Sequence, residues 1–434
     1  MFQTYDEALS WIHSRLRLGM KPGLKRMEWM MEKLDHPERR IKAIHVGGTN
    51  GKGSTVSFLR SILQEAGYKI GTFTSPYIEQ FNERISINGM PIGDDELVQL
   101  ANVIKPLSDE LEETGLGGPT EFEVITAMAL YYFAFVEPVD AAIFEVGLGG
   151  RFDSTNIIHP ILSIITNVGT DHTNILGDSP ADIAFEKGGI IKNGVGLIKG
   201  IKNEDAKKVI VHIAKERKAP VYAIGVEFEA ENHQSLPKGE SFSFRSLFHS
   251  FEGLEISLLG KHQVDNASLA VMAALYLKNF YSFLIDPEHV RNGLKKVYWP
   301  GRFEMASESP IVILDGAHNE DGVKSLVEEL ERRYKGKKIT VIFAALKDKN
   351  YTNMIHDLDG IADQIAFVSF DFPRAAAAKE LYEASSSANK SYSDNWKQEV
   401  ERKIKQLAEK DILVITGSLY FISEVKQVVP EFLA

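Results

Sequence analysis

The sequence predicts an α/β protein with two domains, each built around a mainly parallel sheet. Short apolar or β-branched runs alternate with helical patterns along most of the chain, which is typical of βαβ units. The 434 residues exceed what one hydrophobic core usually serves. The alternation is interrupted at the Pro-Gly stretch "VYWPGRFE" (297–304) and then restarts. We therefore expect domains at residues 1–297 and 298–434.

The N-terminal domain is expected to alternate strands with helices and to carry a small β meander. Apolar runs predict strands at 41–46, 69–74, 140–145 and 161–167. Apolar residues three and four positions apart predict helices at 54–66, 94–113, 121–135 and 182–191. Phenylalanines alternate with polar residues and turn formers between about 226 and 259, which indicates the meander. A helix at 262–280 follows it.

The C-terminal domain is expected to be a second, Rossmann-like α/β unit, because the same alternation resumes after the boundary. The predicted strands lie at 311–314, 338–345, 364–370 and 412–416. The predicted helices lie at 320–334, 351–358, 394–407 and 419–428.

Composition excludes several classes of function. The net charge is −11, from 49 Lys plus Arg against 60 Asp plus Glu, which argues against a nucleic-acid or anionic-membrane partner bound over a broad surface. The chain has no cysteine, so disulfides, thiolate metal sites and a cysteine nucleophile are excluded. The N-terminus lacks the long apolar core of a secretory signal, and no apolar run approaches eighteen residues. We expect a cytoplasmic protein.

The stretch "HVGGTNGKGST" (45–55) suggests a phosphate-binding loop between a strand and a helix. It departs twice from the template G-x-x-x-x-G-K-[ST]: Val46 stands where the first glycine belongs, and Gly53 follows Lys52 in place of a hydroxyl residue. A glycine-rich turn still lets backbone N–H groups converge on phosphate oxygens, aided by the helix N-terminus and the lysine. A tight βα turn is the alternative. The predicted nucleotide contacts are Thr49, Asn50, Gly51, Lys52, Gly53 and Ser54.

Polar residues at the ends of three predicted strands are candidates for a magnesium site. Glu145 ends an apolar strand before a glycine-rich turn, where a Walker-B carboxylate would lie. Asp171 and His172 follow the next strand, and Ser75 ends another. The alternatives are a solvated loop carboxylate, a structural histidine and an ordinary turn serine before Pro76.

These segments together resemble the folylpolyglutamate synthase family, within the murein-ligase-like group of ATP-dependent amide ligases. The resemblance rests on motifs in the family's order between residues 48 and 423: GTNGKGS, TSPY, FNERI, TEFEV, EVGLGGRFDSTN, TDHTNILG, EKGGIIK, NASLA, WPGRFE, DGAHN and TGSLYFIS. The group uses the shortened loop GTNGK, which accounts for both departures from the template. The resemblance identifies the N-terminal domain as P-loop ATPase-like.

The resemblance implies an ADP-forming ligase that uses ATP and magnesium, with two metal ions expected. ATP would phosphorylate a carboxylate of a folate or of dihydropteroate, and the amino group of L-glutamate would attack the acyl phosphate. Ser75 and Glu145 would hold one Mg²⁺, and His172 would help to hold a second. Lys187 matches a lysine that is carbamylated in this group, although a surface helix lysine is the alternative from the residues alone. The implied catalytic residues are Lys52, Lys187, His172 and Arg302.

The remaining site residues are also carried over from the resemblance. Arg302 would reach the phosphates across the domain boundary, Asp315 would lie near the nucleotide sugar, and Asn266 would contact the nucleotide. His318 and Ser418 are candidates for the glutamate pocket. The family places pterin contacts at Thr120, Glu121, Phe122, Glu123, Phe152, Asp153 and Ser154. Core packing is the alternative for the two phenylalanines.

Three other functions remain as alternatives. A P-loop GTPase or switch would carry a guanine-selecting N-K-x-D motif after an apolar strand, and the sequence shows none. A non-catalytic nucleotide-binding module would leave Glu145, His172 and Lys187 dispersed. A murein-precursor ligase typically has an additional N-terminal domain, and here the loop begins only 47 residues into the chain. We expect a monomer, and leave open whether dihydrofolate synthesis accompanies chain elongation.

Overall fold

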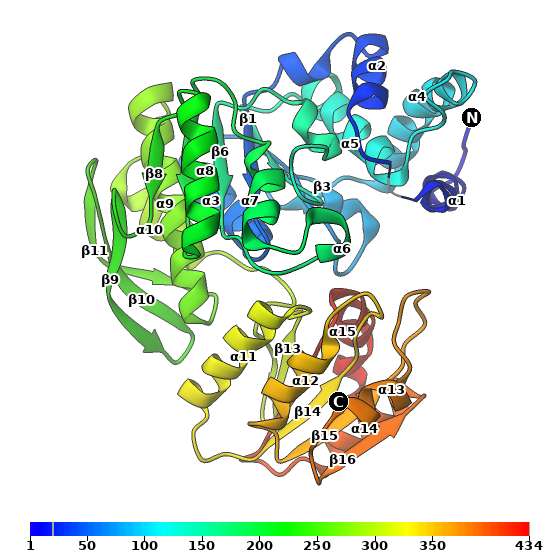
Figure 1. The fold of residues 1–434 in the computed structure, drawn as a ribbon, viewed down its shortest axis with the longest axis vertical. Coiled ribbons are helices and arrows are strands. Elements are labelled where there is room, and N and C mark those ends of the chain that lie inside the picture. The colour runs from blue at the N-terminus through cyan, green and yellow to red at the C-terminus, as the bar shows by residue number, and fades with distance from the viewer. Residues whose placement is uncertain (20, 434) are drawn as a thin grey trace.

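The computed structural model describes residues 1–19 and 21–433, and it contains two α/β domains (Figure 1). The N-terminal domain, blue to green in Figure 1, holds an eight-stranded and a three-stranded sheet. The C-terminal domain, yellow to red, holds a six-stranded sheet. The predicted two-domain α/β architecture is therefore confirmed. None of the described helices combines the length and the apolar character that crossing a bilayer requires.

The large sheet has the order β4-β3-β2-β5-β1-β6-β7-β8. Its strands are β1 (Ala43–Gly47), β2 (Ile70–Phe73), β3 (Ile85–Ile87), β4 (Met90–Pro91), β5 (Ala141–Glu145), β6 (Leu162–Ile165), β7 (Gly196–Lys199) and β8 (Val221–Ala223). All neighbours pair in parallel except β3 and β4 at one edge. From β1 the chain passes to β2, returns to β5 and then crosses to β6. The carboxyl end of β1 is therefore a topological switch point, where α/β sheets bind ligands.

Helices cover both faces of this sheet. One core packs α3 (Lys52–Glu65), α9 (Lys261–Tyr281) and α10 (Pro287–Lys295) against the sheet. The opposite face is covered by α1 (Tyr5–Ser14), α2 (Lys25–Lys33), α4 (Asp94–Glu112) and α5 (Glu121–Tyr131). Near β6 and β7 lie α6 (Thr173–Leu176), α7 (Pro180–Gly188) and α8 (Glu204–Glu216). The central position of α9 explains why its sequence, NASLAVMAALYL, is apolar on all sides.

The predicted meander is confirmed as an antiparallel sheet of β9 (Phe228–Leu236), β10 (Gly239–Ser246) and β11 (Ser250–Ile256). The alternating phenylalanines point to one face because successive side chains of a strand point to opposite faces. Phe228, Phe242 and Phe244 are buried in the core that contains α9.

The C-terminal sheet has the order β12-β13-β17-β14-β15-β16, parallel except for β12 at the edge. Its strands are β12 (Glu304–Glu308), β13 (Ile311–Asp315), β14 (Ile339–Phe343), β15 (Gln364–Val368), β16 (Lys390–Ser393) and β17 (Ile412–Thr416). One face carries α11 (Glu320–Arg333), α12 (Tyr351–Asp359) and α13 (Ala378–Ala384). The other carries α14 (Trp396–Gln406) and α15 (Leu419–Leu433).

A buried ion network joins the domains far from the phosphate loop. Glu240 on β10 is fully buried, and its Oε1 accepts hydrogen bonds from the guanidinium groups of Arg332 (3.0 Å) and Arg333 on α11. The same carboxylate accepts from the Gly260 N–H at 2.7 Å and contacts His233 Nε2 at 2.8 Å. Burying a carboxylate costs desolvation energy, which its four partners offset while they stay in place. The network therefore holds α11 against the β9–β10 hairpin.

Candidate active site

The predicted phosphate loop lies at the carboxyl end of β1 and is held by residues that directly follow β6. Asn167 accepts the backbone N–H groups of Thr49 and Asn50 on its side-chain oxygen, at 3.0 and 2.9 Å. Gly48 has φ +144°, and a Cβ there would lie 1.9 Å from Thr166 Oγ1. Gly51, with φ +80°, directly precedes α3. The glycines are required by the backbone conformation and by close packing, as expected for a phosphate cradle.

The structure explains why a glycine follows Lys52. A Cβ on Gly53 would lie 2.7 Å from the indole ring of Trp299, in the linker between the domains. The standard template allows a serine or threonine at this position, but here the linker tryptophan fills the space. The second departure from the template therefore reflects contact between loop and linker.

Lys52 and Glu145 form the centre of the site. Lys52 Nζ lies 3.9 Å from Glu145 Oε1 and donates hydrogen bonds to the carbonyl oxygens of Gly48 (3.2 Å) and Thr49 (3.1 Å). Glu145 ends β5 and accepts the Ser75 N–H at 3.3 Å on its other oxygen. Burial raises the pKa of the Glu145 carboxyl, and the positive charge of Lys52 opposes this shift. The predicted proximity of loop, lysine, serine and strand-end carboxylate is present in the structure.

Arg302 brings a charge from beyond the linker to this centre. Burial lowers the pKa of its guanidinium, and the carboxylates of Asp315 and Glu145 oppose that effect. Asp315 ends β13 and accepts the backbone N–H groups of Phe303 (2.7 Å) and Ala317 (2.8 Å), so its oxygens also hold the turn around it. Asn266 lies on α9 against the loop, since a Cβ on Gly51 would lie 2.3 Å from its Oδ1.

Lys187 is 3% exposed and lies in the last turn of α7. Burial, followed by the positive charge of Lys52, lowers the pKa of its amino group to about 7, while Asp171 and Asp153 act in the opposite direction. Within residues 1–19 and 21–433, no side chain or carbonyl forms a hydrogen bond with this amino group. The amine is therefore available in its neutral form near neutral pH, which a surface lysine would not offer.

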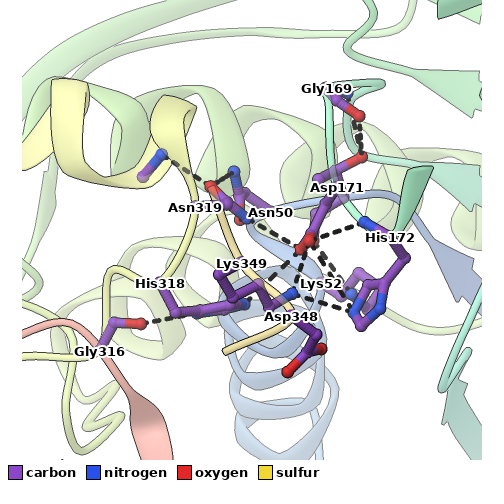
Figure 2. Close-up of polar contacts among 12 residues, drawn as sticks. Asn50, Lys52, Gly169, Asp171, His172, Gly316, His318, Asn319, Asp348 and Lys349 are labelled. Carbon is purple, nitrogen blue, oxygen red and sulfur yellow. Dashed lines mark hydrogen bonds and ion pairs between the residues drawn. The ribbon is translucent and has the colours of Figure 1, made fainter. Parts of the chain in front are cut away.

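A polar cluster around Asp171 spans the domain boundary (Figure 2). Asp171 Oδ1 accepts from Lys349 Nζ at 2.5 Å, and Oδ2 accepts from Asn319 Nδ2 at 3.2 Å. His318 Nε2 and His172 Nε2 each lie 3.9 Å from one of its oxygens. Asp171 follows β6, whereas Lys349, Asn319 and His318 belong to the C-terminal domain. Neither Lys349 nor Asn319 was predicted as a site residue: Asn319 ends the DGAHN motif, but neither local sequence indicates a partner in the other domain.

The charges in this cluster shift the pKa values of its members in opposite directions. Burial alone would raise the pKa of Asp171, but Lys349 and the two histidines hold it below its usual range. Burial and the charge of Lys349 lower the pKa of His318 to about 4. Burial also lowers the pKa of His172. Both imidazoles are therefore neutral at pH 7.

The predicted pterin residues on α5 have structural partners. Thr120 caps α5 by accepting the Glu123 N–H at 3.3 Å, and Glu123 accepts the Thr120 N–H at 2.8 Å. The Glu123 carboxylate also receives Arg26 Nε, at 2.9 and 3.0 Å. Glu121 Oε1 lies 3.3 Å from His13 Nδ1. Phe122 is half-buried with its ring centroid 5.6 Å from that of Phe73.

The predicted substrate residues after the glycine turn, and Ser418, differ in exposure and in hydrogen-bond partners. Phe152 is 45% exposed, and the Arg151 guanidinium lies 4.3 Å from its ring centroid. Asp153 is buried and holds the preceding glycine turn by accepting the Leu148 N–H at 2.9 Å. Ser154 begins a short 3₁₀ helix, Ser154–Ile157. Ser418 is buried at the start of α15, and its hydroxyl has no partner among the described residues.

The oxygen donors at this site, chiefly the Glu145 carboxylate, suit a metal ion that also binds phosphates. They are too few for a site in which the protein supplies every ligand. No group of three or more His, Asp or Glu side chains in the described part of the chain is arranged to hold a metal. Mg²⁺ in phosphoryl-transfer sites typically takes one or two protein oxygens and completes its octahedron with phosphate and water. The buried Glu145 carboxylate beside Ser75 and Lys52 fits that pattern.

Comparisons with known proteins agree with this geometry. Residues 106–274 match the Mur ligase middle domain, and residues 301–419 match the Mur ligase glutamate ligase domain. The chain is 50% identical over 427 residues to a dihydrofolate synthase/folylpolyglutamate synthase of Bacillus subtilis, covering 98% of this chain and 99% of the relative.

Two solved structures show the same fold over nearly all of both chains. One is Mycobacterium tuberculosis folylpolyglutamate synthase complexed with ADP and AMPPCP, with a TM-score of 0.90, 28% identity and 98% coverage of each chain. The other is a complex of FPGS with AMPPCP and folate, with a TM-score of 0.85 and 32% identity, covering 98% of this chain and 100% of that one. The chain belongs to the folylpolyglutamate synthase family of Mur ligases.

Proposed function

We propose that the protein is an ATP-dependent, ADP-forming ligase that adds L-glutamate to folates, or to dihydropteroate, through an acyl phosphate. The observation that carries the proposal is the convergence of Lys52 and Glu145 from one domain with Arg302 from the other. Solved family members bind AMPPCP and folate, which supports the choice of substrates. A GTPase or a non-catalytic module would not require the second domain at the phosphate loop.

The first half of the reaction is a phosphoryl transfer, which depends on positioning and on positive charge around the transferred group. The backbone from Thr49 to Ser54 would cradle the triphosphate, and the N-terminus of α3 would favour its negative charge. Lys52 would leave its two loop carbonyls to bind the outer phosphates. Arg302 would bind them from the opposite side, while Asn266 and Asp315 would contact the nucleoside.

Magnesium is the cofactor that the donor set suits. When bound, it would neutralise phosphate charge and polarise the transferred phosphoryl group. Glu145 and Ser75 would hold one ion, and neutral His172 would offer a lone pair to a second. The raised pKa of Glu145 does not prevent this role, since a nearby cation favours its ionised form.

Lys187 is proposed to be carbamylated. Its neutral amine would attack carbon dioxide, form an N–C bond and lose a proton to solvent, which converts a buried cation into an anion. Lys52 nearby would stabilise that anion, and burial, which disfavours the ammonium, leaves the amine free to react. Intact-mass measurement in bicarbonate tests this step: a mass gain of one carboxyl group supports it, and a Lys187→Met variant should lose that gain.

The second half of the reaction joins the amino group of L-glutamate to the activated carboxyl and releases phosphate. His318 and Ser418 are proposed for the glutamate pocket, since one imidazole nitrogen and one buried hydroxyl remain to be satisfied there. For the pterin, Phe122 and Phe152 offer ring faces, with Thr120, Glu121, Glu123, Asp153 and Ser154 around them. Several of these already have protein partners, so they would position the pocket as well as line it.

The decisive experiment is glutamate-dependent phosphate release, with tetrahydrofolate, dihydropteroate or no acceptor. Release with either acceptor but not without one supports the ligase, and the two acceptors separate chain elongation from dihydrofolate synthesis. The Bacillus subtilis relative is named for both activities. Nucleotide hydrolysis independent of glutamate would instead favour a switch. We also propose that the protein is a cytoplasmic monomer without a nucleic-acid or membrane partner. Its domains are proposed to span residues 1–297 and 298–434. Analytical sedimentation tests the oligomeric state.

A further inference from the structure

The ammonium group of Lys349 contacts two atoms that could bind a divalent cation, one on Asp171 and one on His172. Its Nζ lies 2.5 Å from Asp171 Oδ1 and 3.2 Å from His172 Nε2, and Figure 2 shows it between the two side chains. An ammonium only donates hydrogen bonds, so His172 Nε2 must accept with its lone pair. That lone pair is the one an imidazole offers to a metal ion.

The contact is shielded and joins the two domains. The side chains of Lys349 and Asp171 are 7% and 9% exposed. Asp171 and His172 follow β6 of the N-terminal domain, whereas Lys349 lies between β14 and α12 of the C-terminal domain. Asn319 holds the same carboxylate at 3.2 Å and pairs with Asn50 of the phosphate loop. Lys349 and Asn319 therefore share one carboxylate at the contact between the C-terminal domain and the loop.

We propose that Lys349 acts as a built-in cation that competes with a divalent metal ion for the lone pair of His172. This inference rests on the proposed function, in which His172 helps to hold a divalent cation beside the nucleotide. An ammonium and a metal ion cannot share one lone pair, and two cations at this distance repel each other. Metal binding displaces Lys349 and so breaks an interdomain contact. The two equilibria are linked. Removing the contact between Lys349 and His172 raises the metal affinity by the same factor by which bound metal weakens that contact.

The test compares Mn²⁺ binding by the full chain and its variants, measured by electron paramagnetic resonance of free Mn²⁺, with AMPPCP present. Lys349→Met removes the charge and keeps most of the stem, and we expect about tenfold tighter Mn²⁺ binding, within the usual range of such couplings. Lys347→Met is the matched control, because Lys347 lies two residues earlier and is exposed. It should bind Mn²⁺ as the wild type does. Adding His172→Ala to Lys349→Met should abolish the gain.

Four results would overturn the inference: unchanged or weaker Mn²⁺ binding in Lys349→Met, an equal gain in Lys347→Met, a gain that survives His172→Ala, or no Mn²⁺ binding by any form. If Lys349→Met does not fold, Lys349→Gln replaces it and the same outcomes apply. The measurement needs no turnover. A wild type without ligase activity but with the expected Mn²⁺ pattern would refute the proposed function and leave this inference standing.

Discussion

The side-chain amides of Asn50 and Asn319 donate to each other across the domain boundary, at 3.0 and 2.9 Å. Asn50 belongs to the phosphate loop, and Asn319 caps α11 of the C-terminal domain. The pair means that the C-terminal domain already contacts the loop in this conformation.

Asn319→Ser should weaken this interdomain contact by about 1 kcal/mol, because serine can still cap α11 but cannot reproduce the amide pair. A double-mutant cycle with Asn50→Ser, followed by denaturant unfolding, measures the coupling. Asn395→Ser is the control, since Asn395 caps α14 and its side chain makes no hydrogen bond to the other domain. Additive effects of Asn50→Ser and Asn319→Ser would contradict the prediction.

Arg302→Ala should lower kcat on the order of a hundredfold or more, as removal of a preorganised cation from a phosphoryl-transfer site does. The loss of thermal stability should be far smaller. Arg402→Ala serves as control, because this arginine pairs only with α14 residues at a 46% exposed position. Equal losses of activity and stability in Arg302→Ala would favour a purely structural linker residue.

Lys187 should make the free energy of unfolding depend on pH. Its pKa is about 7 in the folded protein against an ordinary 10.5, so between these values the unfolded chain binds more protons. Stability should therefore rise with pH across this window, by up to about 1.4 kcal/mol per unit.

Denaturant unfolding of wild type and Lys187→Met in carbon dioxide-free buffer isolates the Lys187 contribution. The difference between the two curves should change between pH 7 and 10, whereas Lys208→Met, at an exposed position on α8, should show a constant difference. A constant difference for Lys187→Met would show that the amine titrates normally.

Gly53→Ala should destabilise the protein by about 1–3 kcal/mol, because the added methyl group would meet the Trp299 ring at 2.7 Å. The penalty should shrink when Trp299→Ala is introduced as well, which thermal unfolding of the four-member cycle measures. Gly115→Ala is the control, since a Cβ at this position would have no neighbour within 4 Å and the φ of Gly115 is not in the left-handed region.

Glu240→Gln should cost about 3–5 kcal/mol in the free energy of unfolding, because two arginines would lose their shared buried counter-charge. Glu229→Gln on neighbouring β9 is the matched control: Glu229 pairs with Arg245 on the surface, 40% exposed, and should change stability by less than about 1 kcal/mol. Similar effects of the two changes would argue against an interdomain role for Glu240.

Local sequence patterns predicted most central elements of both domains. Strand β17 begins and ends where expected, at Ile412 and Thr416, because a buried apolar run bounded by polar residues leaves little choice. Strands β3, β4, β7, β8, β12 and β16 were not predicted, because each is only two to five residues long and such short segments give little periodic pattern. The helix expected at 121–135 ends as an α-helix at Tyr131 and continues as a π-helical turn, Tyr132–Val136.

The candidate site was predicted where a motif is local and missed where the partner is distant. The loop, Glu145 and Lys187 each lie in a recognisable segment. Asn50 and Asn319 are separated by 269 residues, and Asp171 and Lys349 by 178, so no local pattern could join them. Glu240 shares a face of β10 with the buried Phe242 and Phe244, but the local sequence does not indicate that its partners are Arg332 and Arg333, 92 and 93 residues away.

The indole of Trp299 against Gly53 has a consequence for engineering and for detecting such proteins. The space available to residue 53 is limited by Trp299, almost 250 positions away in the chain. The nucleotide loop and the interdomain linker must therefore be altered together. A standard loop sequence grafted onto this scaffold would place a larger side chain against Trp299 and would call for a smaller residue at position 299. A search based on the standard loop template alone would overlook chains in which a glycine stands at the Ser/Thr position and a distant aromatic ring fills the space.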